Sequence, residues 1–141
     1  MNANAQEKCV HRLVDKIMNN AEKILCLEES DIDGAEVIVV SYGITSRVAV
    51  KAIEMAQADG LKVGHMRLVT VWPFPEKRIR ELAAHVKSFV MPELNYGQMF
   101  MELKSAVEGK ANTYLIPHGG GTVHEPEVIY RKIKEAACQR Q

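Results

Sequence analysis

Two loops of this chain carry the side chains best suited to binding or chemistry. The first follows the apolar run Val37–Val40 and reads S-Y-G-I-T-S-R from Ser41 to Arg47. Its hydroxyls and guanidinium, with the backbone N–H groups of a following helix, suit a phosphate or a carboxylate. The same residues also suit a capped helix start beside a glycine turn. The candidate contact residues in this loop are Tyr42, Gly43, Thr45, Ser46 and Arg47.

The second loop reads P-E-L-N-Y-G-Q from Pro92 to Gln98 and follows another apolar run. Glu93, Asn95 and Gln98 could contact a ligand or a partner protein, and Glu93 has the chemistry of a general acid or base. No second carboxylate or histidine is obviously paired with Glu93. The structural alternative is that these three side chains cap the next helix and bond the neighbouring loop.

Three weaker signals accompany these loops. The turn Trp72-Pro73-Phe74-Pro75 is aromatic and stiffened by proline, so it suits either a docking surface or a plug for the domain's own core. The run Gly119–Gly121 suits either a close backbone approach to a ligand or a mobile connector. His118 and His124 flank that run, and two histidines without further ligands are a weak indication of a metal site.

Hydrophobic periodicity predicts the elements that position these loops. A long amphipathic helix is expected from about Glu7 to Leu27, followed by an exposed acidic turn over residues 28–34. Four strand-then-helix units follow, with strands at about residues 36–42, 62–69, 88–92 and 112–116. The first helix of these units is expected to have Thr45 or Ser46 as its N-cap.

This alternation predicts an α/β fold of three layers, α/β/α, around a mainly parallel sheet. The first and third strands are nearly continuous apolar runs, as expected of central strands, and the second and fourth carry polar residues, as expected of edges. With right-handed crossovers the simplest strand order is 2-1-3-4. The two loops then face each other across the switch point between the first and third strands. We expect an N-terminal helix and acidic linker over residues 1–34 and the α/β domain over residues 35–141.

Composition excludes several classes of protein. The 18 basic residues balance 18 acidic ones, so the chain has no electrostatic footprint for nucleic acid or for an anionic membrane. No apolar run approaches the roughly 18 residues of a membrane-spanning helix, and the first residues do not form a signal peptide. Three dispersed cysteines without a C-x-x-C pair argue against a disulfide framework, an iron–sulfur cluster and a structural zinc. We therefore expect a cytoplasmic protein.

The motifs in their order resemble one known family. Four segments match it: Ser41–Gly43 with Arg47, Gly64 to Pro75 with its W-P-F-P end, Pro92–Asn95 with Gly97 and Gln98, and Gly119 to Glu127. Over almost the whole chain, from about His11 onward, the sequence resembles the C-terminal portion of the α subunit of 2-oxoacid:ferredoxin oxidoreductases. The resemblance implies a domain similar to the C-terminal domain of transketolase.

The resemblance also implies thiamine diphosphate, magnesium, iron–sulfur clusters and coenzyme A in the whole complex, which oxidises a 2-oxoacid and passes electrons to ferredoxin. This chain shows neither the pyrimidine-binding domain that normally precedes the region nor the G-D-G…N motif for magnesium diphosphate. We therefore expect no catalytic residue, no metal site and no cofactor bound by this chain alone. Its expected partners are the remaining α-subunit domain and the β subunit, with γ or δ subunits in some complexes.

The leading hypothesis is an assembly domain of such an oxidoreductase, with the loop residues named above and Trp72 facing its partners. Pyruvate, 2-oxoglutarate or a branched-chain oxoacid are the substrates that the family implies, and 2-oxoglutarate and the branched-chain oxoacids are the main candidates. The alternative is a free-standing flavodoxin-like module that binds a small anion or nucleotide through Thr45, Ser46 and Arg47. A homodimer, through the edge of the second strand or the Trp72 turn, is a further expectation.

Overall fold

A five-stranded sheet forms the centre of the structure, a computed structural model that describes residues 2–139. Its strands run in the order β1-β3-β2-β4-β5. β1 is antiparallel to β3, and the other neighbouring strands are parallel. The four parallel strands therefore have the predicted order 2-1-3-4. The strands are β1 (Leu27–Ser30), β2 (Val37–Tyr42), β3 (Val63–Leu68), β4 (Ser88–Glu93) and β5 (Asn112–Pro117).

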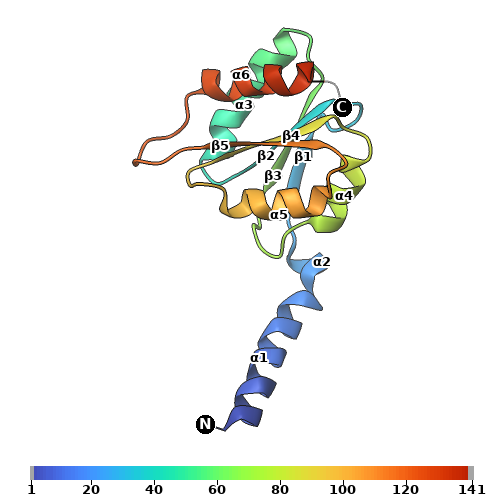
Figure 1. The fold of residues 1–141 in the computed structure, drawn as a ribbon, viewed down its shortest axis with the longest axis vertical. Coiled ribbons are helices and arrows are strands. Elements are labelled where there is room, and N and C mark those ends of the chain that lie inside the picture. The colour runs from blue at the N-terminus through green and yellow to red at the C-terminus, as the bar shows by residue number, and fades with distance from the viewer. Residues whose placement is uncertain (1, 140–141) are drawn as a thin grey trace.

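Helices cover both faces of this sheet, as the alternation of elements predicts (Figure 1). On one face lie α3 (Thr45–Ala58) and α6 (Pro126–Cys138), and on the other lie α4 (Glu76–Ala83) and α5 (Gln98–Val107). No helix within the described residues 2–139 combines the length and the apolar character needed to cross a membrane.

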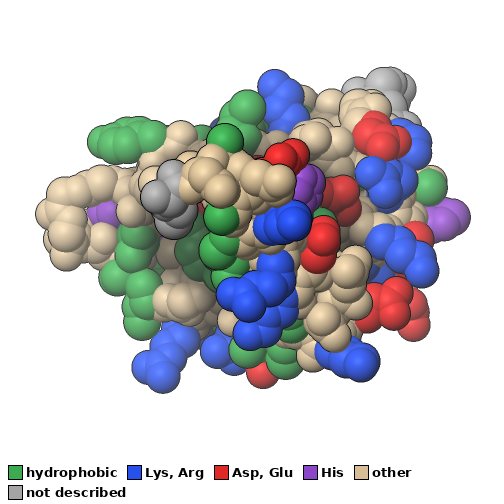
Figure 2. Space-filling model, turned by 90° about the horizontal axis from the view of Figure 1, so that it is seen from below, with side chains coloured by type: hydrophobic (Ala, Val, Ile, Leu, Met, Phe, Trp, Pro, Cys, Tyr) green, Lys and Arg blue, Asp and Glu red, His purple; other side chains and the backbone are tan. Residues whose placement is uncertain are grey.

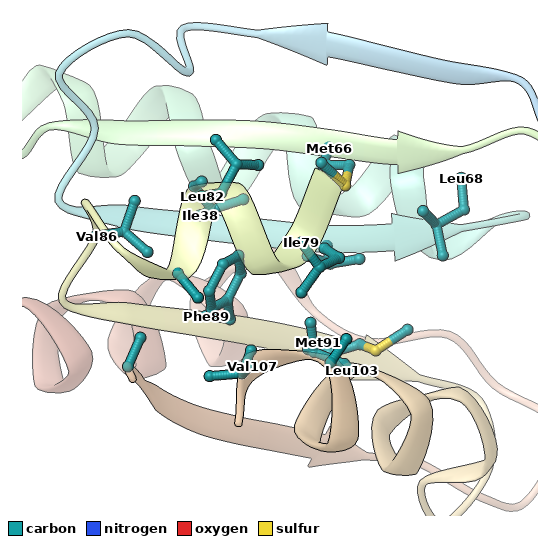
Figure 3. Close-up of a cluster of buried hydrophobic side chains, with 14 of the residues drawn as sticks. Ile38, Met66, Leu68, Ile79, Leu82, Val86, Phe89, Met91, Leu103 and Val107 are labelled. Carbon is teal, nitrogen blue, oxygen red and sulfur yellow. The ribbon is translucent and has the colours of Figure 1, made fainter. Parts of the chain in front are cut away.

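The central strand β2 shows why the sheet needs two covering layers. Val37 and Val39 pack with the apolar side chains of α3 and α6, whereas Ile38 and Val40 pack with those of α4 and α5. All four are fully buried, which is the pattern of a parallel strand that is covered on both faces. Figure 3 shows the second of these clusters, where Phe89 of β4 lies among side chains from the sheet, α4 and α5.

Because of β1, the expected turn over residues 28–34 and the expected edge position of β3 are both wrong. Residues 28–34 do not form a turn throughout, because Leu27 pairs with Leu68 and Ser30 pairs with His65. β1 therefore covers β3, which lies inside the sheet and not at its edge, so the expected dimerisation through that edge is blocked. β1 comes from the expected 1–34 segment, and the structure places it in the same sheet as strands of the 35–141 segment.

The N-terminal segment is two helices and not one. α1 (Ala3–Met18) has Asn19 as its C-cap, and the short α2 (Ala21–Ile24) follows. α1 projects away from the body and buries none of its residues (Figure 1). Its apolar stripe is exposed and consists of Val10, Leu13, Val14 and Met18. A single helix of this length is marginally stable in water, so an unpartnered stripe of this kind suits contact with another protein surface.

Candidate functional site

The sheet opens at the predicted switch point. Hydrogen-bonded pairing between β2 and β4 ends at Val39 and Val90, three residues before either strand ends. β2 continues to pair with β3 as far as Tyr42, and β4 continues to pair with β5 as far as Glu93. The last residues of the two central strands are therefore free to bond through their side chains.

Tyr42 and Glu93 close this opening. The Tyr42 hydroxyl donates to Glu93 Oε1 at 2.9 Å, and Asn95 Nδ2 donates to the Tyr42 hydroxyl at 2.9 Å. Burial, followed by the hydrogen bond and negative charge of Glu93, raises the pKa of Tyr42 to about 12. The phenol therefore stays protonated at neutral pH and acts as a hydrogen-bond bridge between the two strands.

Glu93 and Asn95 also hold the start of α5. Glu93 is fully buried, and its carboxylate accepts the N–H groups of Met99 at 2.9 Å and Phe100 at 3.4 Å. Asn95 Oδ1 accepts the N–H groups of Gly97 and Gln98 at 2.8 and 2.9 Å. A carboxylate at a helix N-terminus satisfies otherwise unpaired N–H groups and complements the helix dipole.

For Glu93 and Asn95 this geometry matches the structural alternative for the second loop, in which the side chains cap the helix and bond the neighbouring loop. Every polar atom of the Tyr42, Glu93 and Asn95 side chains has an internal partner, so the three side chains form one closed hydrogen-bonded group. Gln98 is the first residue of α5, and its side chain is exposed.

The first loop builds a separate cluster. Thr45 and Ser46 are both buried, but neither is the N-cap of α3, which is Ile44. Thr45 Oγ1 donates to the Tyr42 carbonyl oxygen at 2.6 Å, which ties the loop back to the end of β2. Gly43 has a φ of 57°, a left-handed conformation that glycine adopts at little cost. The expected hydroxyl cap is therefore replaced by a hydroxyl that bonds backwards to the strand.

His65 also belongs to this cluster, although it is not among the site residues predicted from the sequence. Its Nε2 lies 2.7 Å from Ser41 Oγ, and Ser41 Oγ lies 3.0 Å from Ser46 Oγ. Burial, and secondarily the positive charge of Arg67, lowers the pKa of His65, so the ring is neutral at pH 7. The available signal was a histidine inside a strand otherwise rich in apolar residues.

A groove of about 410 Å³ lies against this cluster, on the side of the sheet that carries α3. Its walls come from β1, β3 and the start of α3, and they include Glu28, Glu29, Ser30, Gly43, Ser46, Arg47, Val50, His65 and Arg67. Arg67 pairs with Glu28 at 2.8 Å, and Arg78 pairs with Glu29 at 2.8 Å. Both carboxylates are thus neutralised, whereas the exposed Arg47 has no hydrogen-bond or ion-pair partner for its guanidinium among residues 2–139.

The loops that follow the parallel strands expose large apolar side chains. Trp72, in the turn after β3, is 58% exposed, and Tyr96, in the loop after β4, is 83% exposed. Four further exposed apolar residues lie in the loops after the parallel strands, namely Ile44, Val69, Leu94 and Val123. Figure 2 shows hydrophobic side chains mainly on the side of the loop after β5, and charged ones mainly on the opposite side. We call these six residues the apolar rim.

The Trp72 turn places its two aromatic rings differently. Phe74 is buried and packs into the cluster between the sheet and α4, so it fills the domain's own core. Trp72 points outward and belongs to the apolar rim.

The two histidines around the glycine run lie together. Their ring centroids are 5.0 Å apart, His118 Nε2 lies 2.7 Å from Thr122 Oγ1, and His124 Nε2 donates to the Ile116 carbonyl oxygen at 2.9 Å. Burial lowers the pKa of His124, whose Nδ1 is buried without a hydrogen-bond partner. Within the described part of the chain, no three His, Cys, Asp or Glu side chains gather in a metal-binding group.

The cofactors implied by the resemblance can be compared with these side chains. An iron–sulfur cluster needs a set of cysteine ligands, but Cys9, Cys26 and Cys138 are all exposed and unpaired. The described acidic and histidine residues likewise do not converge on a site for the magnesium of a diphosphate. The residues present therefore do not fit either group.

Most of the chain is similar to parts of known proteins. Residues 35–129 match the sequence profile of pyruvate:ferredoxin oxidoreductase core domain II. The chain is 40% identical over 132 residues to 2-oxoglutarate synthase subunit KorA of Methanothermobacter marburgensis, which covers 94% of this chain and 35% of that protein. It is 44% identical over 110 residues to ketoisovalerate oxidoreductase subunit VorB of the same organism, covering 78% and 31% respectively.

Solved structures agree with these sequence matches. The 2-oxoglutarate:ferredoxin oxidoreductase from Magnetococcus marinus, solved with 2-oxoglutarate, coenzyme A and succinyl-CoA bound, has a TM-score of 0.79 at 26% identity, over 97% of this chain and 24% of that one. A split-gene transketolase shares the fold with a TM-score of 0.62 at 18% identity, over 77% and 40%. The chain thus spans about a third of the length of the curated relatives it matches.

Proposed function

The chain belongs to the family of pyruvate:ferredoxin oxidoreductase core domain II, and we propose that it is the assembly domain of a 2-oxoacid:ferredoxin oxidoreductase α subunit. In this role it contributes no catalytic side chain. It docks against the rest of the α subunit and against the β subunit, with γ or δ subunits where a complex has them. The complete complex would convert a 2-oxoacid to an acyl-CoA with thiamine diphosphate and reduce ferredoxin.

One observation carries this proposal: at the carboxyl end of the sheet, three polar side chains of the switch point bond internally, whereas large apolar side chains are exposed. The Tyr42, Glu93 and Asn95 side chains bond only to each other and to the backbone of α5. Within the apolar rim, Trp72 and Tyr96 are largely exposed. Aromatic side chains are enriched at the centres of protein interfaces, so exposed rings on two loops suit a docking face.

The extent of the sequence match supports the same role. The match to the 2-oxoglutarate synthase subunit covers 94% of this chain but only 35% of the relative, so most of the relative lies outside the matched region. The matched part includes at least part of the projecting α1, because 132 matched residues of 141 leave about nine outside and α1 has 16. The exposed stripe of α1 is therefore a second surface suited to the remaining domains.

Substrate choice is proposed to reside outside this domain. The chain is similar to a subunit named for 2-oxoglutarate at 40% identity and to one named for ketoisovalerate at 44% identity. Two relatives named for different 2-oxoacids match it almost equally well. This supports either 2-oxoglutarate or a branched-chain oxoacid as the substrate of the complex.

Complementation tests the assembly role. The KorA relative of Methanothermobacter marburgensis, produced without the segment that this chain matches, is mixed with this chain, and association is followed by analytical ultracentrifugation. We expect a complex that Trp72→Asp weakens at least about tenfold, because a charge would be buried at the centre of the interface. Lys51→Gln, on the exposed side of α3, is the matched control and leaves association unchanged.

A second measurement tests the absence of a catalytic site. The chain alone is titrated with thiamine diphosphate and magnesium by isothermal calorimetry, and no saturable heat is expected. Tight binding by the isolated chain would overturn the proposal. Failure of Trp72→Asp and Lys51→Gln to differ in the complementation assay would remove the apolar rim from the interface.

A further inference from the structure

The groove beside α3 ends on a chain of hydrogen bonds that leads to a free ring nitrogen. With Ser41 Oγ as donor to Ser46 Oγ, the Ser41 oxygen accepts its second hydrogen bond from His65 Nε2–H. In the neutral ring this arrangement leaves the lone pair on Nδ1. His65 is only 8% exposed, yet it lines the groove, and its Nδ1 has no hydrogen-bond partner among residues 2–139.

Ser46 and Arg47 add two hydrogen-bond donors to the groove that His65 lines. Because Ser46 Oγ accepts from Ser41, its own hydroxyl proton remains available to a group in the groove. Arg47 lies at the same wall with a guanidinium that has no ion-pair partner in the described chain. A guanidinium and a hydroxyl are donors that recognise a tetrahedral oxyanion, and the imidazole at the same groove adds an acceptor when neutral and a third donor when protonated.

The charges that face the groove decide the sign of its ligand. From β1 come Glu28 and Glu29, and both carboxylates are held by arginines at 2.8 Å. From β3 comes Arg67, the partner of Glu28, and from α3 comes Arg47. With both carboxylates paired, the unpaired charge at the groove is positive.

We propose that this groove is a binding site for a phosphate group, held by the Arg47 guanidinium, the Ser46 hydroxyl and His65 Nδ1. Neutral His65 favours a phosphate that keeps one proton over a fully ionised anion. The P–OH group of such a phosphate can donate to the Nδ1 lone pair, which a fully ionised anion cannot do. Protonation of the ring gives a second mode, in which Nδ1–H donates to a phosphate oxygen. The inference does not depend on the assembly role, since the groove involves none of the apolar rim residues.

The test uses the full chain and two probes at constant ionic strength, namely inorganic phosphate and phenyl phosphate, with chloride as the reference. Amide and imidazole resonances are followed by NMR. We expect saturable shifts at Gly43, Ser46 and the His65 ring, and an upward shift of the pKa of His65 when phosphate is bound. Binding of phenyl phosphate alone assigns the site to a phosphorylated molecule, and binding of both assigns it to the phosphate group itself.

Matched variants separate a built site from general attraction. Arg47→Gln removes an exposed side chain and should weaken binding about tenfold, the effect of losing one charge-assisted contact. Lys51→Gln removes a positive charge one turn further along α3, outside the groove, and should leave binding unchanged. Shifts that do not saturate, that chloride reproduces, or that the two variants reduce equally would overturn the site. Circular dichroism of each variant confirms that the fold is retained.

Discussion

The Tyr42 hydroxyl donates to Glu93 Oε1 across the point at which β2 and β4 separate, at a distance of 2.9 Å. Backbone pairing between these central strands stops at Val39 and Val90, so this side-chain bond takes its place. The same carboxylate accepts two N–H groups of α5. One buried side chain therefore links both central strands to the helix that follows.

Glu93→Gln should lower the free energy of unfolding by about 1–3 kcal/mol, the cost of leaving buried polar groups unsatisfied. The glutamine amide places an NH2 group where one carboxylate oxygen accepts backbone N–H groups, and the negative charge at the helix N-terminus is lost. Urea denaturation measures the change. The control is Glu102→Gln on the exposed side of the same helix, expected to stay within about 0.5 kcal/mol. Equal stability of the two variants would show that Glu93 does not hold α5.

Tyr42 should make stability fall at high pH. Its pKa is about 12 in the folded protein and near the ordinary value of 10 when unfolded, so the folded state binds the proton more tightly. The contribution is fully present below pH 10 and is lost as the pH rises from 10 to about 12. Tyr42→Phe removes this dependence. Denaturation at several values between about pH 9 and 11 should therefore show a smaller fall in the free energy of unfolding for the variant than for the unmodified protein. The same slope in both proteins would contradict the shifted pKa.

Trp72 and Phe74 lie two residues apart, but truncation of each should change the free energy of unfolding by very different amounts. Phe74→Ala removes a buried ring from the cluster beneath α4 and should cost about 3–5 kcal/mol. Trp72→Ala alters a side chain that is 58% exposed and should change stability by less than about 0.5 kcal/mol. Thermal and urea unfolding provide the comparison. A large loss for Trp72→Ala would mean that the outward-facing ring supports this domain and not an interface.

Two N-terminal deletions should separate the projecting helix from the sheet. Removing residues 1–20 takes away α1, which buries none of its residues, and should leave the unfolding free energy within about 1 kcal/mol. Removing residues 1–34 also takes away β1 and the Ile32 contact with the core, and should cost at least about 2 kcal/mol. It also uncovers the edge of β3, so sedimentation should show self-association of this shorter chain. Equal stability of both deletions would place the domain boundary at residue 34.

The sequence by itself determined the layers and the order of the parallel strands. Runs such as Val37–Val40 are apolar at every position, which requires helices on both faces of the sheet, and right-handed crossovers then leave few arrangements. The same reasoning placed Tyr42 and Glu93 on opposite sides of one opening. The W-P-F-P and E-L-N-x-G-Q motifs indicated the family that the comparisons show.

Only the tertiary structure decided how these residues are bonded. β1 escaped detection because Leu27–Ser30 is short and acidic, and its strand conformation depends on pairing with β3, about 40 residues away in the chain. His65 could not be assigned to the Ser41 and Ser46 cluster for the same reason, since 24 residues separate it from Ser41. Hydrophobic patterns report which face of an element is buried. Which polar groups meet is set by the register between strands distant in sequence, and that register appears only when the sheet has formed.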